Sequence, residues 1–509
     1  MLLEIGKVWP PKSDQHRIKL YERYHKFFKG EHHTAFRYLG SRSDVDKRLS
    51  PRKIALILNY PALITKGSTD LLAGEAPKYV ATGRGGKAVQ DALNSIVSKN
   101  RFDSVLYSAL TVTSYRGDGV FRVRDNGERV VVEQVPAHNY FVLLDPDNET
   151  EVLAQAVAWI REDPSGYYLR VEHHEAGKIT NEAFRIKEKK GTGEWDVQAQ
   201  VPLTEAYSPP FMPPAEEEFT GIDRPLIQHL QNYYDGESYW GFSDYGGGLD
   251  TLFEALNNRL SKIDSYLDRH QRPILIGMPG MADTEGQMDS RKDYVEPQTP
   301  EQAKDLPRYV TWDGQMEAAF KELEELKRQI RVQSETPKRL LGESEDSSID
   351  SSRAMLNDFI PIEKKVNRKR TLADPVVKEV LMLALELHKI RYEKDLNLDG
   401  ISIDIKWQDG VPQDYMEAAQ TESTLVQNSL TSKQSAMERL YGIGPEEAKA
   451  ELDRMQAEAK SEQPPQAAPG DTLPGQPGEM SPPSGRAVPV TGIAANGAVG
   501  ARNQQSGGT

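Results

Sequence analysis

The second half of the chain holds the arrangement that most constrains its fold. Two stretches, roughly Asp244 to Arg269 and Gly314 to Gln333, carry apolar residues at the i, i+3, i+4 and i+7 spacing of amphipathic helices. The insert between them is rich in Gly and Pro and has two short apolar strand candidates, residues 274–276 and 308–312. This order predicts a paired-helix stalk with a cap, which is more typical of an assembled channel than of an active-site cleft.

A polar segment, residues 334–352, follows the second helix and has two adjacent cations before a series of acids and serines. Its charged candidates are Lys338, Arg339, Glu343, Glu345, Asp346 and Asp350. An ordinary solvated connector would have the same composition. The functional interpretation is a mobile, charge-bearing loop that the helices present.

The first part of the chain has an α+β pattern. Aromatic residues at helical spacing predict a helical opening to about Tyr60, and further helices are expected at residues 62–73, 86–99 and 102–116. From Gly119 the apolar period changes to two, which predicts a β-meander. Its expected strands are residues 120–125, 128–135, 140–145, 152–160 and 167–175. Residues 202–225 read as an extended connection.

The long helical stretch after Ser352 should be kinked at Pro361 and Pro375, because each proline removes a backbone donor and crowds the preceding turn. A strand is expected at residues 401–407. Three short helices should follow, the last opening at Pro445. The composition of residues 461–509 predicts a disordered tail.

Composition excludes several classes of function. The chain has 509 residues, a formal net charge of −14 and no cysteine, which excludes disulfides, thiolate metal sites and a cysteine nucleophile. We expect neither export nor membrane insertion, because there is no signal-peptide pattern and no apolar run of the ~18 residues that span a bilayer. The negative charge argues against tight wrapping of nucleic acid but permits DNA to slide past.

Three motifs suggest chemistry and are better explained otherwise. Asp395 to Gly400 matches half of a calcium loop, but Lys406 stands where a bidentate glutamate is required, so a helix-to-strand turn is expected. The run from Gly83 to Lys87 lacks the Walker pattern and reads as a loop before a helix. His173 and His174 should point to opposite faces of a strand, as polar surface.

No catalytic motif supports an enzyme, and no cofactor or metal is expected.

The chain is similar to the portal, or head-to-tail connector, proteins of tailed bacteriophages, particularly the siphophage type. The similarity covers roughly residues 15 to 460. It rests on the order of helix, insert, helix, loop and long helix together with short motifs. These are Tyr24 to His32, Asn59-Tyr60-Pro61, Leu72 to Pro77, Tyr239 to Asp244 and Leu256 to Ser261.

The resemblance implies a portal-type fold with defined regions. Residues 1–240 and 353–411 would form the wing, the latter as a long kinked helix and a strand. Residues 241–271 and 313–333 would be stem helices, and residues 272–312 the clip. Residues 334–352 would be a tunnel loop that faces DNA with the six charged residues named above. Residues 412–460 would form the crown.

The resemblance also implies a function and partners. Family members form a ring, usually of twelve subunits, at one capsid vertex, through which double-stranded DNA is packaged and ejected. Expected partners are other copies of the chain, the DNA, the terminase, neck or adaptor proteins, and scaffold and major capsid proteins. The protein would be part of the virion, be assembled in the host bacterial cytoplasm, contact no membrane and catalyse nothing. A channel-less helical scaffold or adaptor and a carboxylate-dependent hydrolase remain alternatives.

Overall fold

The computed structural model divides into two compact units, residues 1–413 and residues 414–509. It describes residues 4–32, 56–83, 86–189, 191, 193–207, 211–270, 274–276, 308–310, 316–343, 352–408, 410 and 415–461. The first unit contains both helices and strands, and helices alone form the described part of the second. The α+β class expected from the sequence is confirmed.

The described helices of the first unit are α1 (Lys12–Lys29), α4 (Tyr60–Ala73), α5 (Gly86–Asn100), α6 (Phe102–Arg116), α7 (Leu203–Ala206), α8 (Leu249–His270), α9 (Met316–Ser334) and α10 (Ser352–Arg391). Except for the short α7, which was not predicted, they begin close to where apolar periodicity predicts them. The expectation of a helical opening to about Tyr60 was wrong in extent. Helix α1 ends at Lys29 because Gly30 takes the left-handed conformation with φ of 81°, and residues 33–55 lie outside the described residues.

The strands form two larger sheets rather than one continuous meander. The three-stranded sheet has the order β11-β3-β4, and the seven-stranded sheet has the order β1-β9-β8-β7-β6-β5 with β10 paired to β8. The strands are β1 (Val8–Trp9), β3 (Asp118–Asp125), β4 (Val130–Val135), β5 (Tyr140–Leu144), β6 (Val152–Asp163), β7 (Gly166–Glu175), β8 (Lys178–Lys189), β9 (Glu194–Val201), β10 (Glu217–Phe219) and β11 (Ile227–Gln231). A single 3₁₀ turn, Ala137–Asn139, carries the chain from one sheet to the other.

Two sequence expectations are corrected here. The meander does not stop near Glu175, because β8 and β9 extend it by two antiparallel strands. The segment 202–225, expected as an extended connection, contains the short helix α7 and the strand β10.

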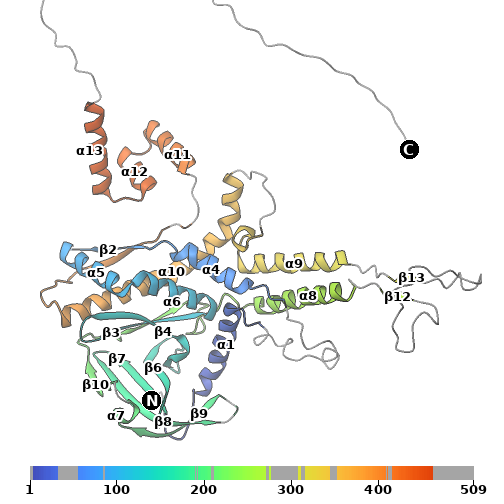
Figure 1. Ribbon diagram of the computed structural model, residues 1–509. Helices are drawn as coiled ribbons and strands as arrows, with labels where there is room; N and C mark the ends of the chain where they lie inside the picture. Colours follow the sequence, from blue (N-terminus) through green and yellow to red (C-terminus); the bar gives the residue numbers. More distant parts are fainter. Residues whose placement is uncertain are drawn as a thin grey trace, which may run out of the picture. The chain divides into compact units, whose positions relative to one another are not determined.

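Helices α8 and α9 pack side by side as an arm, in agreement with the paired-helix prediction (Figure 1). Their facing side chains form one apolar cluster that includes Phe253, Leu256 and Ile263 from α8 with Leu323 and Ile330 from α9. Full burial of side chains of this size contributes about 1.5–3 kcal/mol each. The insert between the helices contains the antiparallel strands β12 (Ile274–Ile276) and β13 (Arg308–Val310).

Helix α10 runs for 40 residues and contains both prolines, Pro361 and Pro375. Figure 1 shows its first turns running in a different direction from the remainder, as expected for a helix bent at a proline. The later turns pack on the three-stranded sheet and on α4 and α5. Beyond the helix, β14 (Ser402–Lys406) pairs antiparallel with β2 (Lys78–Thr82).

The largest core lies between the three-stranded sheet and the helices that cover it. Side chains from α5, α6 and α10 fill it, including Leu93, Leu106, Val377 and Leu381, all fully or almost fully buried. The seven-stranded sheet has a smaller core of its own around Trp9 and other apolar residues. In Figure 1 the helices lie on one side of β3 and β4, and this second sheet lies on the other.

The described part of the second unit contains three helices, α11 (Tyr415–Gln427), α12 (Lys433–Tyr441) and α13 (Pro445–Ser461). This agrees with the expectation of three short helices with the last opening at Pro445. Ser432 caps α12, because its side chain accepts a hydrogen bond from the backbone of Ser435. The tail expected to be disordered lies, beyond residue 461, outside the described residues.

Candidate functional site at the base of the helical arm

The sequence-predicted DNA-facing residues begin where α9 ends. Lys338 and Arg339 lie in a 3₁₀ turn, η3 (Lys338–Leu341), with Lys338 exposed and Arg339 half-buried. Glu343 follows the turn and forms an ion pair with Arg331 of α9. The other three predicted residues, Glu345, Asp346 and Asp350, lie outside the described residues.

Turn η3 is anchored on the body of the first unit. Leu341 and Thr336 are buried, and η3 packs against α4, where the side chain of Leu340 lies over Gly67. Gly342 ends the turn in the left-handed conformation with φ of 72°. The first part of the predicted tunnel loop is therefore a packed turn that gives its two cations a defined place.

A buried carboxylate, Asp244, lies in the segment that leads into α8 and contacts several elements. Its Oδ2 accepts a hydrogen bond of 2.5 Å from the hydroxyl of Ser114 at the end of α6, and its Oδ1 accepts one of 3.0 Å from Asn232 after β11. The backbone amide of Asp244 donates to the carbonyl of Ser114 at 2.9 Å. The start of the arm is thus tied to the helix and the strand behind it.

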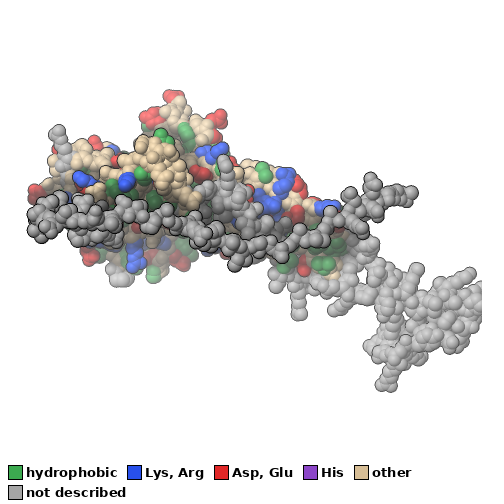
Figure 2. Space-filling model, turned by 90° about the horizontal axis from the view of Figure 1, so that it is seen from above, with side chains coloured by type: hydrophobic (Ala, Val, Ile, Leu, Met, Phe, Trp, Pro, Cys, Tyr) green, Lys and Arg blue, Asp and Glu red, His purple; other side chains and the backbone are tan. Residues whose placement is uncertain are grey.

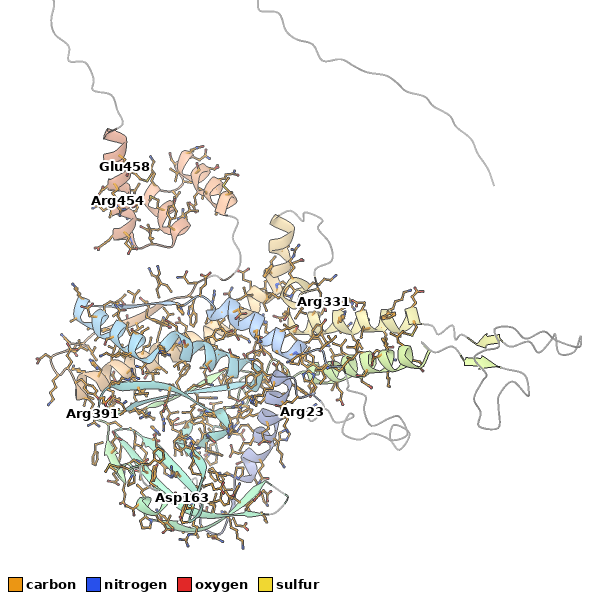
Figure 3. All side chains as sticks on the ribbon, viewed as in Figure 1. Arg23, Asp163, Arg331, Arg391, Arg454 and Glu458 are labelled. Atoms are coloured by element: carbon orange, nitrogen blue, oxygen red, sulfur yellow. The ribbon has the colours of Figure 1, made fainter. Side chains whose placement is uncertain are left out.

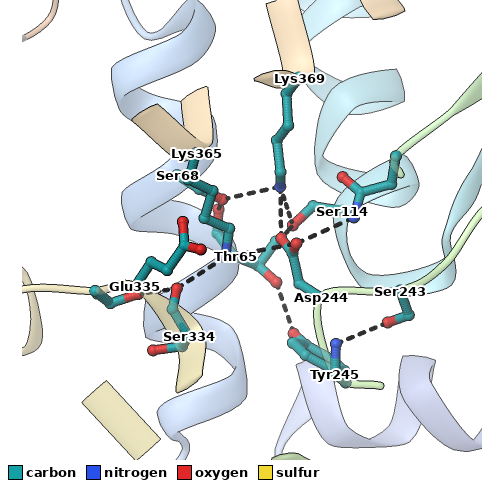
Figure 4. A network of polar contacts seen from close by, with 12 residues as sticks. Thr65, Ser68, Ser114, Ser243, Asp244, Tyr245, Ser334, Glu335, Lys365 and Lys369 are labelled. Atoms are coloured by element: carbon teal, nitrogen blue, oxygen red, sulfur yellow. Dashed lines mark hydrogen bonds and ion pairs between the residues drawn. The ribbon is translucent and has the colours of Figure 1, made fainter. Parts of the chain in front are cut away.

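Two lysines of α10 reach the same carboxylate (Figure 4). The ammonium of Lys369 lies 2.5 Å from Oδ2 of Asp244, and that of Lys365 lies 3.5 Å from Oδ1. Lys365 also donates a 3.1 Å hydrogen bond to the carbonyl of Ser334, the last residue of α9. One carboxylate and two ammonium groups therefore connect the segment before α8 and the end of α9, both at the base of the arm, to the long helix α10.

Burial and charge act against each other at this cluster. Burial by itself would raise the pKa of Asp244, but Lys365 and Lys369 outweigh burial and hold that pKa well below its ordinary value. Burial lowers the pKa of Lys369 to about 8, although the negative charge of Asp244 opposes this. The ionised carboxylate is the stable form, and the cluster is a buried ion triad.

Close backbone contact lets the chain before Asp244 reach this position. A Cβ atom added to Gly241 would lie 2.4 Å from the carbonyl oxygen of Gly117, and one added to Gly117 would lie 2.5 Å from that of Gly241. Gly117 also has a φ of 101°, in the left-handed region that favours glycine. Both glycines are required where α6 and the segment that leads into α8 pass each other.

Several of the motifs that carried the family resemblance meet around the base of α8. Tyr24 and Phe27 of α1 pack against Tyr245, with ring centroids 5.9 and 6.4 Å away, and Phe27 packs edge-on against Phe253. The hydroxyl of Tyr245 lies 2.7 Å from that of Thr65 on α4. Segments that are far apart in the sequence therefore form one aromatic cluster beside Asp244.

Asparagines explain two more of these motifs. Asn257 of α8 accepts a hydrogen bond of 2.7 Å from the backbone of Leu58 and donates one of 3.0 Å to Nδ1 of the buried His32. Asn59 caps α4 by accepting a hydrogen bond from Ala62 at 3.3 Å. These amide side chains fix the backbone on either side of the aromatic cluster.

Ion pairs add to the contacts of the arm. Arg23 on α1 lies 2.8 Å from Asp250 in the first turn of α8, and Figure 3 shows Arg23 where α1 approaches the start of α8. Arg259 on α8 pairs with Glu322 on α9. Basic and acidic side chains are interspersed on the described surface in Figure 2.

The motifs set aside from the sequence have structural explanations. Lys406 lies in β14, and Gly400 turns the chain into that strand with φ of 68°, which confirms the helix-to-strand turn. Helix α5 begins at Gly86, as expected for a loop before a helix. His173 and His174 bond to different carboxylates, but the expectation of polar surface was wrong for His174, whose side chain is buried against Glu172.

Two further observations concern only the part of the chain that the structure describes. There, no group of three or more His, Cys, Asp or Glu side chains is placed to hold a metal ion. None of the helices combines the length and the apolar composition needed to cross a membrane.

Comparison with known proteins identifies the family. The model of the family described as phage portal protein, SPP1 Gp6-like, matches residues 11–465, which include every element described above except β1. The chain belongs to this portal protein family. A portal, or head-to-tail connector, role follows from that membership.

Two solved structures are similar to this portal-family chain. One, from the virion of a native gene transfer agent particle, has 13% identity and a TM-score of 0.42 and covers 79% of this chain and 98% of its own. The other, from the neck of the native particle computed with C12 symmetry, has 12% identity and a TM-score of 0.41 and covers 74% and 89%. No curated protein sequence matches the chain.

Sequence reasoning missed the ion triad of this portal-family chain. Asp244 was interpreted as the first residue of a helix, whereas α8 begins at Leu249. A usable signal was present in α10, where Lys365 and Lys369 share a helix face with buried apolar residues such as Ile362 and Val366. Lysines within an apolar stripe are buried only when they are paired, so they indicate a hidden carboxylate.

Proposed function

We propose that the chain assembles into a ring at one vertex of a phage capsid, through which double-stranded DNA is packaged and later ejected. The match of the portal family model to residues 11–465 carries this proposal. The arm of α8 and α9 supports it, because a narrow amphipathic pair of helices leaves an outer face on each helix for neighbouring copies. Phe320 and Val332 on α9 are 47% and 61% exposed, as expected for apolar side chains that a neighbouring copy covers in the ring.

We assign the regions of the chain by the order of elements in the portal family. The wing comprises residues 1–240 and 353–411, and the stem comprises residues 241–271 and 313–333, which contain α8 and α9. Residues 272–312 form the clip, residues 334–352 the tunnel loop and residues 412–460 the crown. The ion triad at Asp244 then lies where the wing joins the stem, so it sets the angle at which the arm leaves the body.

The charge of residues 334–352 is suited to the passage of DNA through such a ring. A channel must not hold phosphates so tightly that translocation stalls, and an acidic lining with few cations keeps contacts weak and sensitive to salt. Lys338 is exposed on the anchored turn η3 and Arg339 is beside it, so both can touch phosphates transiently. Glu343 is paired with Arg331 and contributes less repulsion than its charge alone suggests.

The same function defines the partners and the location. A portal is the platform for the terminase motor and for neck or adaptor proteins, and it contacts scaffold and major capsid proteins during assembly. The protein is a structural component of the virion, is assembled in the host bacterial cytoplasm, catalyses no reaction and needs no cofactor. ATP hydrolysis belongs to the terminase.

Negative-stain electron microscopy of the purified protein tests the proposal. We expect closed rings with a central hole, usually of twelve subunits. Compact particles or fibres without a hole would favour a channel-less scaffold or adaptor. Monomers that hydrolyse cell wall or nucleic acid would favour the carboxylate-dependent hydrolase and overturn the proposal.

A further inference from the structure

An open pocket of about 470 Å³ lies beside the ion triad, where α9 ends. Its walls come from the segment before α8, from the end of α9 and from α10. The charged side chains in its lining are Asp244, Glu335, Lys365 and Arg368. Lys369 stands directly behind, in contact with Asp244.

Among the residues that the structure describes, the charges around this pocket do not balance. Three cations, Lys365, Lys369 and Arg368, face two carboxylates, Asp244 and Glu335. Arg368 pairs with Glu335, which leaves both ammonium groups to share Asp244 alone. The two lysine side chains are only 3% and 5% exposed, so water compensates little of the excess positive charge.

An excess charge in such surroundings is costly. Removal of an ion from water costs several kcal/mol unless an opposite charge lies nearby. Lys365 lines the pocket and is the more weakly paired of the two ammonium groups, because its contact to Asp244 is long at 3.5 Å and its other acceptor is the neutral carbonyl of Ser334. A carboxylate in the pocket would complete the set of charges.

The rim of the pocket is suited to a protein side chain. Phe242 is 48% exposed, and Leu249 lies in the same lining. Gly246 and Gly247 form part of the wall, and a Cβ added to Gly247 would meet no atom within 4 Å. An aromatic rim, an open glycine wall and a buried ammonium together fit an acidic side chain, whose methylene groups contact the rim while its carboxylate reaches Lys365.

We propose that this pocket receives a carboxylate side chain from a neighbouring copy of the chain in the assembled ring. The inference rests on the proposed ring function, because only assembly brings a second copy to the base of the arm. Charge complementarity supports it, since the chain has a net charge of −14 and so presents many carboxylates to its neighbours. A phosphate of moving DNA is a poorer occupant, because a recessed ammonium with an apolar rim would hold it rather than release it.

Gln333 offers a test that leaves the triad intact. It is exposed, lines the pocket and has a neutral amide. Gln333→Glu places a carboxylate into the pocket within the same chain, where it competes with that of the neighbour. Gln333→Met has similar length without charge and is the matched control.

The two variants should differ in assembly and in stability. We expect Gln333→Glu to raise the melting temperature of the monomer and to raise at least about tenfold the concentration at which half of the protein is in rings. Gln333→Met should assemble within about twofold of the wild type. Equal assembly of wild type and Gln333→Glu would overturn the inference while leaving the ring itself in place. A wild-type chain that never forms rings would overturn both.

A second measurement identifies the occupant directly. Rings assembled from a mixture of ¹⁴N- and ¹⁵N-labelled chains are treated with a carbodiimide, which joins a carboxylate to an adjacent lysine. The proposal predicts mixed-isotope cross-links between the peptide that contains Lys365 and an acidic peptide, and their loss in Lys365→Arg rings. Cross-links to Asp244 within single chains only, or stabilisation of rings by inorganic phosphate without mixed-isotope products, would contradict it.

Discussion

Replacement of Asp244 by asparagine should strongly destabilise the first unit while preserving the shape of the side chain. The carboxylate is buried, and its oxygens lie 2.5 Å from the ammonium of Lys369 and 3.5 Å from that of Lys365. With an effective dielectric constant of about 20, Coulomb's law gives attractions of about 7 and about 5 kcal/mol. Desolvation of the three ions offsets most of this sum, and loss of one partner from a buried ion pair costs about 3–5 kcal/mol net.

The measurement is urea unfolding of the monomeric protein, followed by tryptophan fluorescence. We expect Asp244→Asn to lower the free energy of unfolding by about 3–5 kcal/mol, because two buried ammonium groups lose their counter-charge. Adding Lys369→Met should restore at least about 1 kcal/mol, since it removes one of the unpaired charges. Glu317→Gln is the control, because its ion pair with Lys321 is largely exposed and is worth less than about 1 kcal/mol.

Two outcomes would refute the reasoning. A loss below about 1 kcal/mol for Asp244→Asn would mean that the triad is no stronger than a surface pair. Strictly additive effects of Asp244→Asn and Lys369→Met would mean that the two groups do not interact in the folded protein.

Three further predictions concern pH, backbone packing and DNA. The folded-state pKa of Asp244 lies below its ordinary value of 3.8, so its contribution to stability is present in full above pH 3.8 and is lost as the pH falls further. The free energy of unfolding should therefore fall less steeply with decreasing pH in Asp244→Asn than in the wild type. In urea unfolding, Gly241→Ala should lower the free energy of unfolding by more than about 2 kcal/mol, because its Cβ would lie 2.4 Å from a backbone oxygen. Gly444→Ala is the control, and it should change this free energy by less than about 0.5 kcal/mol, because its Cβ would meet no atom within 4 Å. Replacing both Lys338 and Arg339 with alanine should reduce packaging or retention of DNA while rings still form; unchanged genome length and particle yield in a complementation assay would count against their role.

Local sequence patterns were sufficient to predict most helices and the two strands of the insert that the structure describes. Apolar periodicity placed α5 and α6 within a residue of their observed ends, and the turn signals of Gly444 and Pro445 placed α13. Strands β12 and β13 were also expected, because short apolar runs stand out in a Gly- and Pro-rich insert, although their pairing was not predicted. These elements are determined by residues close together in the chain, which explains why reading the sequence was enough.

Elements that depend on distant partners were missed or misjudged. Strand β8, Lys178–Lys189, carries many charged residues and becomes recognisable only through its pairing with β7 and β9. The pairing of β2 with β14 joins Thr82 to Ser402, far beyond the reach of any local pattern. The same limit applies to the candidate site, where the partners of Asp244 come from two separate helices and from the residue that follows β11.

The predicted tunnel-loop residues illustrate both cases. Clustered charge identified Lys338 and Arg339 as candidates, and the structure holds them on a packed turn beside the arm. The pairing of Glu343 with Arg331 could not be read from the sequence, because it depends on how the chain folds back after α9. The DNA-facing role of all six residues stays a prediction.

A cryo-EM reconstruction of the purified assembly tests the portal account most directly, because it locates α8 and α9 relative to the axis. The account predicts a closed ring whose central channel is lined by the α8 and α9 arms, with the turn that carries Lys338 and Arg339 at the channel wall. An assembly without an axial opening, or a ring that places these helices on its outer rim, would contradict it.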